Sequence, residues 1–439
     1  MSNVPMTRSE EALAQLETTH GYAATFVERA DGSILQLSST NFTTSYDGGL
    51  TWSEPFQCRD TNGDLVGDGG MSLVRLAGNG IGLSAVRHTP AEMGSRSRLL
   101  FWRSDDGGQT WTPPVAATPE GLNSSAYHDT MIRTASGRLI LPVYCSMGQQ
   151  TAVGEGAMPR PGKLLRGQWV ETNAHFFDRG ATCSYVCYSD DEGRTWQRNK
   201  DGELIVLLDG NAIFSYTNEP SVAEVAPGKL LMFLRTGLGR VFQAWSFDDG
   251  ETWTRPAPTS LATSTAPGKI RTLPNGHLLA VWNQQSETEI KQGYIRSRIS
   301  SAISRNGGSV WEFFQNVTSL HEETRVEPGP IRPVRPAEHY LAPGVPAPER
   351  EGEHITPAEE LVTMTYPAVL VLKDRVIIAH RYREYREHPT RAEILVSNPQ
   401  PGTHGFIQKL KVLPLRWFYG GKESAENTFI PRAEMPATP

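Results

Sequence analysis

The sequence is poor in the features that mark several large classes of protein. Its 439 residues include only 4 cysteines and no C-x-x-C pair. Thiols this few and this scattered cannot form a disulfide framework, and they offer no zinc-binding spacing. We therefore expect no metal site, and buried thiols at Cys58, Cys145, Cys183 and Cys187.

Long apolar runs and basic clusters are missing as well. No stretch approaches the roughly 18 apolar residues of a membrane span, and the first 20 residues are polar where a secretion signal would be apolar. The formal net charge of -6 comes with no basic run suited to nucleic acid. The sequence thus predicts a cytoplasmic protein that binds neither membranes nor nucleic acid, and no motif indicates a cofactor.

Glycine and proline are plentiful, with 41 and 31 residues, as is typical of many short strands and turns. The most specific feature is a repeated phrase, Ser-x-Asp-x-Gly-x-Thr-Trp. An Asp with a Gly close behind favours a hairpin turn, and the spacing within the phrase is that of a turn rather than of a calcium or catalytic site. Four complete copies and a degenerate fifth indicate a repeated structural unit; they lie at 45–52, 104–111, 189–196, 246–253 and 304–311.

A second pattern, two apolar segments joined by a short turn, precedes each copy and occurs once more near the end of the chain. Two hairpins per unit make a four-stranded sheet, and six units make a propeller. The sequence therefore predicts an all-β fold, a six-bladed β-propeller of four-stranded antiparallel blades. We place it at 20–415, between a polar extension at 1–19 and a C-terminal tail at 416–439.

The connection between the second and third strands varies most in length, from 13 residues between Gly32 and Ser45 to 52 between Gly137 and Ser189. In a four-stranded meander this connection lies at the end opposite both hairpin turns. Long loops therefore gather on one face, where binding chemistry is expected. The two largest insertions, at 146–181 and 315–360, would overhang that face.

The first strand of each blade begins at this loop-bearing face, so residues just before these strands should converge on the axis. Many of them are titratable or aromatic, which exceeds what a propeller needs for stability, because buried charges cost free energy unless they are paired. The residues expected at this mouth are His20, Tyr22, Asp68, Tyr127, His128, Asp129, Asn218, Glu219, Ser264, Thr265, Thr365 and Tyr366.

The repeated phrases resemble the Asp-boxes of sialidases and related β-propellers, where their role is structural. The stretch from Asn218-Glu219-Pro220 to the Leu-Arg pair ending at Arg235 resembles the fourth-blade segment of sialidase-like proteins. That resemblance implies that Glu219 partners a nucleophilic tyrosine and that Arg235 belongs to a carboxylate-binding cluster.

Two further stretches extend the resemblance. Thr365-Tyr366-Pro367-Ala368 is similar to the segment that carries the nucleophilic tyrosine, and Arg298 resembles the last arginine of the cluster. Tyrosine is a poor nucleophile at neutral pH, but a carboxylate within hydrogen-bond reach can take its proton. Retaining sialidases use tyrosine in this way, and arginines suit a sugar carboxylate.

Two departures from the family pattern concern the first blade. The stretch 21–25 has no arginine where family members have one, and the loop 35–45 lacks the acid aspartate. Asp68 and Asp129 are the candidate replacements by position.

Three functions are therefore compatible with the sequence. The first is an exo-acting glycoside hydrolase of sialidase type that cleaves a terminal, acidic sugar. The second is a polysaccharide lyase, in which Tyr366 or His128 would remove the proton beside a uronate carboxylate that Arg235 neutralises. The third is a carbohydrate-binding or protein-binding propeller without catalysis.

Overall fold

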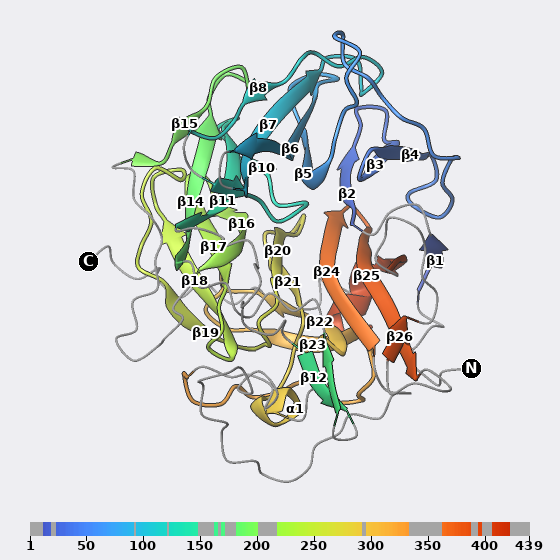
Figure 1. The fold of residues 1–439 in the computed structure, drawn as a ribbon, viewed down its shortest axis with the longest axis vertical. Coiled ribbons are helices and arrows are strands. Elements are labelled where there is room, and N and C mark those ends of the chain that lie inside the picture. Colours follow the sequence, from blue (N-terminus) through green and yellow to red (C-terminus); the bar gives the residue numbers. More distant parts are fainter. Residues whose placement is uncertain are drawn as a thin grey trace.

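The fold is a ring of six antiparallel sheets around one axis, the six-bladed β-propeller that the repeats predict. Figure 1 shows the first strands of the blades turned toward the centre and the later strands at the rim. The computed structural model describes residues 12–18, 23–91, 94–120, 123–147, 162–165, 168–171, 181–200, 217–291, 296–332, 362–387, 394–396 and 406–421.

The first three blades follow one another along the chain, with β9 added beside β11 in the third. Their strands are β2 (Thr25–Glu28), β3 (Ile34–Ser38) and β4 (Asn41–Ser45); β5 (Gly69–Arg75), β6 (Ile81–Ala91), β7 (Gly94–Ser104) and β8 (Val115–Ala116); and β9 (Asn123–Ser125), β10 (Ile132–Arg133), β11 (Leu139–Met147), β14 (Ala181–Ser189) and β15 (Gln197–Arg198).

The last three blades continue the same order, and a separate hairpin, β12 with β13, lies within the insertion expected at 146–181. The remaining elements are β12 (Gly162–Leu165) and β13 (Gln168–Glu171); β16 (Asn218–Ala226), β17 (Lys229–Arg235), β18 (Arg240–Ser246) and β19 (Ala257–Ala262); β20 (Lys269–Thr272), β21 (Leu278–Trp282), α1 (Glu287–Lys291), β22 (Arg298–Ser304) and β23 (Glu312–Ser319); and β24 (Val362–Val371), β25 (Arg375–Glu387), β26 (Ile394–Val396), β27 (Ile407–Pro414) and η5 (Leu415–Tyr419).

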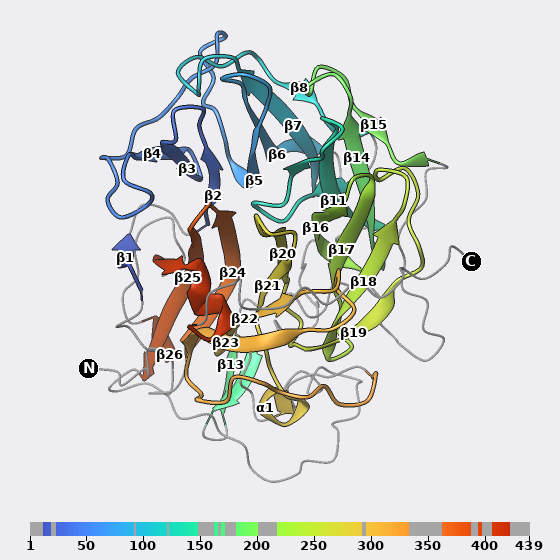
Figure 2. The same cartoon turned by 180° about the vertical axis from the view of Figure 1, so that it is seen from behind.

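The sixth blade is completed by the start of the chain. β1 (Ala14–Thr18) pairs with β27 as the outermost strand, in the order β24-β25-β27-β1, and Figures 1 and 2 both show it at the rim. The sheet therefore reaches into the segment expected to be an extension, 1–19. At the other end, Trp417, Phe418 and Tyr419 of η5 are buried in the core, although the tail was expected to begin at residue 416.

The Asp-boxes are hydrogen-bonded turns at the ends of the third strands. In the second box, Asp106 Oδ1 accepts from the Thr110 amide at 2.9 Å, and its Oδ2 accepts from the Thr110 hydroxyl at 2.6 Å. Ser104 Oγ accepts from the Gly108 amide at 2.8 Å. The degenerate box keeps the amide contact through Asn306 Oδ1, at 2.9 Å from the Val310 nitrogen, but Val310 has no hydroxyl to add.

Each box also packs against the preceding blade. The second glycine of the turn, or the single glycine where there is only one, has φ between +83° and +96°, and a Cβ placed there would meet a side chain of the neighbouring blade. The pairs are Gly49 with Ile377, Gly108 with Leu35, Gly193 with Phe101, Gly250 with Ile140 and Gly308 with Leu231. Glycine is thus needed both for the turn and for the contact between blades.

The box face lies opposite the mouth. In the fourth blade, Leu230 pairs with the box residue Ser246, whereas Arg235 at the other end of β17 pairs with Asn218. The boxes therefore close the end of the sheet farthest from Glu219.

An ionic cluster fills the axis beneath the mouth. Asp129 is 3% exposed, and its Oδ2 accepts from Arg271 Nη2 at 2.6 Å and from the Val369 amide at 2.8 Å. Its Oδ1 accepts from the Thr25 hydroxyl at 3.2 Å. The fully buried Lys269 donates to the Asp129 carbonyl at 2.7 Å. One residue of the third blade thereby contacts the first, fifth and sixth.

The cysteines are four buried free thiols, as the sequence predicts. Cys145 and Cys183 lie opposite one another on β11 and β14.

The boxes generate a stability prediction. Burial opposes ionisation of Asp106, but hydrogen bonds from Thr110 and Ser104 outweigh it and lower its pKa. Replacing Asp106 by Ala should reduce the free energy of unfolding by about 1 kcal/mol or more, and Asp106→Asn should cost less, because Asn306 keeps the same amide contact. Urea unfolding measures both. Because the pKa of Asp106 is lowered in the folded state, its carboxylate stabilises the fold above the ordinary pKa of a carboxyl group. The difference in unfolding free energy between the wild type and Asp106→Ala should therefore shrink as the pH falls below about 4.

The axial cluster generates a second prediction. Asp129→Asn leaves Arg271 and Lys269 without a counter-charge and should cost about 3–5 kcal/mol. The matched control is Asp68→Asn, because Asp68 is partly exposed and 3.5 Å from Arg87; it should stay within about 0.5 kcal/mol. Equal costs for the two variants would argue against an axial role for Asp129.

Candidate active site

The mouth is built on an unusual backbone conformation repeated in several blades. Gly70, Asp129, Glu219 and Tyr366 have φ of +57°, +57°, +41° and +57°. In β5, β16 and β24 the pairing register shifts at this point, as in a β-bulge. Left-handed φ values at residues other than glycine carry strain, and such residues cluster at functional sites. The bulge turns the side chain away from the strand's ordinary alternation.

Tyr366 and Glu219 lie in contact across the mouth. The Tyr366 hydroxyl donates a hydrogen bond to Glu219 Oε1 at 2.7 Å, although the two residues are 147 positions apart. Arg235 Nη1 contacts the other oxygen, Oε2, at 2.5 Å. The structure thus brings together the three residues of the fourth and sixth blades that the resemblance singles out.

The electrostatics of the pair suit a proton acceptor beside a phenol. Burial opposes ionisation of Glu219, but Arg235 and the hydrogen bond from Tyr366 outweigh it and lower the pKa of the carboxyl. Burial and the Glu219 charge raise the pKa of Tyr366, while the neighbouring arginines oppose that rise. At neutral pH the resting pair is therefore a carboxylate and a protonated phenol.

Aromatic groups of the third blade form the wall behind Tyr366. The Tyr127 hydroxyl donates to the Pro367 carbonyl at 2.6 Å, and the Tyr127 ring lies edge-on to Tyr366 at 5.6 Å. His128 stacks on Tyr366, and its Nε2 is 3.1 Å from the Tyr366 carbonyl oxygen. Burial, with help from Lys269, lowers the pKa of His128 well below its ordinary value, so the ring is neutral at pH 7. His128 therefore supports the backbone of Tyr366.

Two arginines that the sequence analysis missed also face Tyr366. The guanidinium carbon of Arg381 lies 4.3 Å from the centre of the Tyr366 ring, and that of Arg296 lies 5.3 Å from it. Arg296 Nη2 donates to the Thr265 carbonyl at 3.3 Å, and Arg235 Nη2 donates to the Thr265 hydroxyl at 3.4 Å. Three guanidinium groups therefore gather around one tyrosine and one carboxylate, an arrangement suited to an anionic sugar.

The repeat contains a signal that could have identified Arg381. In the fourth blade Arg235 pairs with Asn218, the residue before Glu219. In the sixth blade Arg381 pairs with Thr365, the residue before Tyr366. The two arginines hold the same register position on the second strand of their blades.

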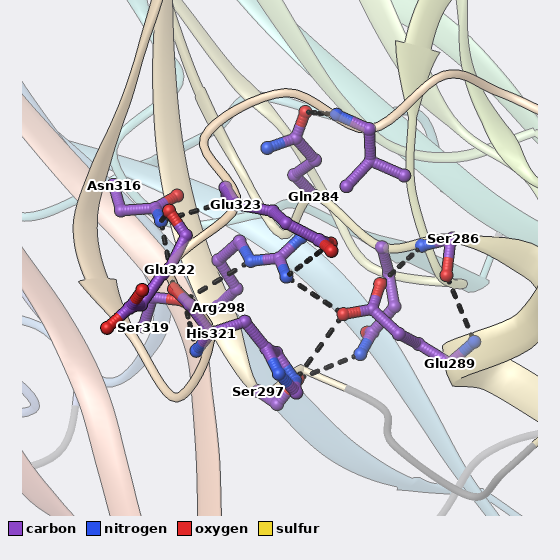
Figure 3. Close-up of polar contacts among 12 residues, drawn as sticks. Gln284, Ser286, Glu289, Ser297, Arg298, Asn316, Ser319, His321, Glu322 and Glu323 are labelled. Atoms are coloured by element: carbon purple, nitrogen blue, oxygen red, sulfur yellow. Dashed lines mark hydrogen bonds and ion pairs between the residues drawn. The ribbon is translucent and has the colours of Figure 1, made fainter. Parts of the chain in front are cut away.

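Arg298 is not part of this group. Figure 3 shows it within a polar cluster of the fifth blade, where it is fully buried and Nη2 donates to Glu289 Oε1 at 2.8 Å. Its Nε lies 3.2 Å from Ser319 Oγ. The neighbouring Arg296, which precedes β22 and has φ of +62°, points to the mouth instead. Arg298 was expected to lie beside Arg235, but the structure places Arg296 there instead, with both Arg296 and Arg235 hydrogen-bonded to Thr265.

The two candidate acids lie in different surroundings. The Asp129 carboxylate is bonded to Arg271 and to the Val369 amide in the axial cluster, so it contributes to the stability of the fold. Asp68 precedes β5, and its partly exposed carboxylate lies 3.5 Å from Arg87 on β6. His20 and Tyr22 fall outside the described residues, as does most of both expected insertions.

Within the described ranges, no helix is long and apolar enough to cross a bilayer. The same part of the chain contains no group of three or more His, Cys, Asp or Glu side chains placed to hold a metal ion.

Comparison with known proteins finds a curated sequence relative and several solved structures with a similar fold. A curated relative, the anhydrosialidase of Macrobdella decora, is 28% identical over 165 residues, which is 38% of this chain and 18% of that protein. The Hadza microbial sialidase Hz136 has a similar structure, with a TM-score of 0.51, 14% identity, and coverage of 93% of this chain and 67% of that one.

Another similar structure is the intramolecular trans-sialidase of Ruminococcus gnavus, solved with oseltamivir carboxylate, with a TM-score of 0.50 and 13% identity over 94% of this chain and 97% of that one. At such identities these structures show the shared fold. Residues 72–378 match the family described as BNR repeat-like domain. Because that match spans well over half of the sequence, the chain belongs to the BNR repeat-like domain family, with a sialidase-like propeller fold.

Proposed function

We propose that this protein is an exo-acting glycoside hydrolase of sialidase type that removes a terminal acidic sugar. The observation that carries the proposal is the 2.7 Å hydrogen bond from the Tyr366 hydroxyl to the Glu219 carboxylate. The proteins with similar folds include sialidases and an intramolecular trans-sialidase, which supports a sialic acid as the terminal sugar.

The proposed reaction begins with binding of the sugar carboxylate by Arg235, Arg296 and Arg381. Glu219 accepts the phenolic proton while Tyr366 attacks the anomeric carbon, and the bond to the leaving group breaks as its oxygen takes a proton from the acid, for which Asp68 is the candidate. Water then attacks the same carbon, gives its proton to that acid and releases Tyr366, which recovers its own proton from Glu219. Two displacements at one carbon retain its configuration.

The lyase alternative has weaker support. Its base would have to be His128 or Tyr366, yet His128 is 3% exposed and its ring nitrogen faces the Tyr366 carbonyl. A Glu219 already positioned to accept the phenolic proton fits nucleophilic attack better than proton removal from carbon. Product analysis separates the two, because a lyase product has a new double bond that absorbs ultraviolet light.

The nucleophile and its base can be tested by substitution. Tyr366→Phe and Glu219→Gln should each lower kcat by several orders of magnitude on a sialoside, because each removes one half of the proton-transfer pair. The unfolding midpoint and the affinity for free sialic acid serve as controls and should stay close to wild type for Tyr366→Phe. Near-native turnover by Tyr366→Phe would rule out tyrosine as the nucleophile.

The acid role of Asp68 stays a prediction, and the leaving group offers the test. Asp68→Asn should lower kcat/KM about 100-fold or more on an alkyl or glycan sialoside, whose leaving oxygen needs a proton. An aryl sialoside with an acidic phenol leaves without one and should be affected little. Equal losses on both substrates, or none on either, would place the acid elsewhere.

A further inference from the structure

Three consecutive amide side chains follow β21 in the fifth blade, and all are buried. Asn283, Gln284 and Gln285 are exposed by 0%, 0% and 1%. Buried amides need hydrogen-bond partners, so their contacts indicate what they hold in place. Asn283 Nδ2 donates at 2.7 Å to the carbonyls of Arg298 and Met364, and thereby ties β22 to the strand that carries Tyr366.

Gln285 brackets the backbone of Arg296. Its Oε1 accepts from the Arg296 amide at 2.8 Å, and its Nε2 donates to Ser297 Oγ at 2.9 Å. The oxygen of the Gln285 amide therefore holds the backbone of Arg296, and its nitrogen holds the side chain of the next residue, Ser297. Arg296 has φ of +62°, a left-handed backbone conformation that residues with a Cβ rarely adopt. A bidentate clamp is the kind of support that such a conformation requires.

The clamp is itself anchored in the polar cluster of Figure 3. Ser297 Oγ lies 3.2 Å from His321 Nε2, which lies 3.4 Å from Glu289 Oε1. Glu289 also binds the fully buried Arg298. Arg298 therefore contacts the mouth only indirectly. It binds Glu289, which lies beside His321, and His321 contacts the Ser297 hydroxyl that Gln285 also bonds.

We propose that Gln285 is the positioning residue for Arg296 and so sets the preference of the site for a carboxylate-bearing sugar. The clamp on Arg296 rests on the contacts above, whereas the carboxylate preference rests on the proposed function. Arg296 and Arg235 both bond to Thr265, so a shift of the Arg296 backbone would separate two guanidinium groups that now meet at one residue. Displacements of about 1 Å can cost two orders of magnitude in function.

The test compares Gln285→Met with Gln284→Met. Gln284 is an equally buried amide one residue earlier, but it bonds to Ser300, Thr324 and Val326 rather than to Arg296. Hydrogen exchange of the Arg296 amide should accelerate in Gln285→Met and stay at the wild-type rate in Gln284→Met. Gln285→Glu, which keeps an oxygen for the Arg296 amide, should restore the protection and covers the case in which the Met variant fails to fold.

The second measurement is ligand affinity, with N-acetylneuraminic acid and its uncharged methyl ester as probes. Gln285→Met should weaken binding of the acid by about tenfold or more and change binding of the ester less than twofold. In turnover of an aryl sialoside the variant should raise KM more than it lowers kcat.

Two outcomes would overturn the inference. One is wild-type exchange of the Arg296 amide in Gln285→Met, and the other is an equal loss of affinity for acid and ester. A wild-type protein that binds neither probe would overturn the proposed function and the carboxylate preference with it, while the exchange of the Arg296 amide would still decide whether Gln285 holds that residue.

Discussion

The propeller depends on a carboxylate buried on its axis. Asp129 bonds to Arg271 in the fifth blade, to the Val369 amide in the sixth and to Thr25 in the first. Because a buried charge is costly unless paired, these contacts fix the relative positions of blades that share no strand pairing. Val369 lies three residues after Tyr366, so the same carboxylate holds the strand that presents the phenol.

The architecture could be predicted from the sequence because the boxes are local. Each box is written in eight consecutive residues, and the hydrogen bonds that close its turn, such as those of Asp106 with Thr110, stay within that stretch. Ring closure could not be predicted in this way, because the pairing of β1 with β27 joins residues nearly 400 positions apart and β1 has no turn motif to mark it. Residues 1–19 are polar in composition, so the strand β1 within them was not predicted, and the side chains of that strand are mostly half-buried.

The site residues could be predicted where their positions follow the repeat. They could not be predicted where a local backbone conformation decides which way a side chain points. Glu219 and Tyr366 were expected at the mouth from the starts of their strands, and Arg235 was implied by the family resemblance. Arg381 would have followed from the register position of Arg235. Arg296 and Arg298 are two residues apart, a spacing that places both side chains on one face of a regular strand. The left-handed φ of Arg296 breaks that alternation. The neighbouring residues do not predict it, because the Arg296 backbone is held by Gln285 from the segment that follows β21.

The same left-handed backbone conformation recurs in several of the six blades. The left-handed position at the mouth holds Gly70 in the second blade, Asp129 in the third, Glu219 in the fourth and Tyr366 in the sixth. Glycine adopts it at little cost, whereas the other three residues need support from their side chains, and each is tied by its carboxylate or hydroxyl to a different blade. The hydrogen bond between Tyr366 and Glu219 thus joins two strained residues, and it stabilises the conformation that aligns them. The geometry of the candidate nucleophile and base is in this sense a property of the closed ring, since neither blade alone could hold its residue in place.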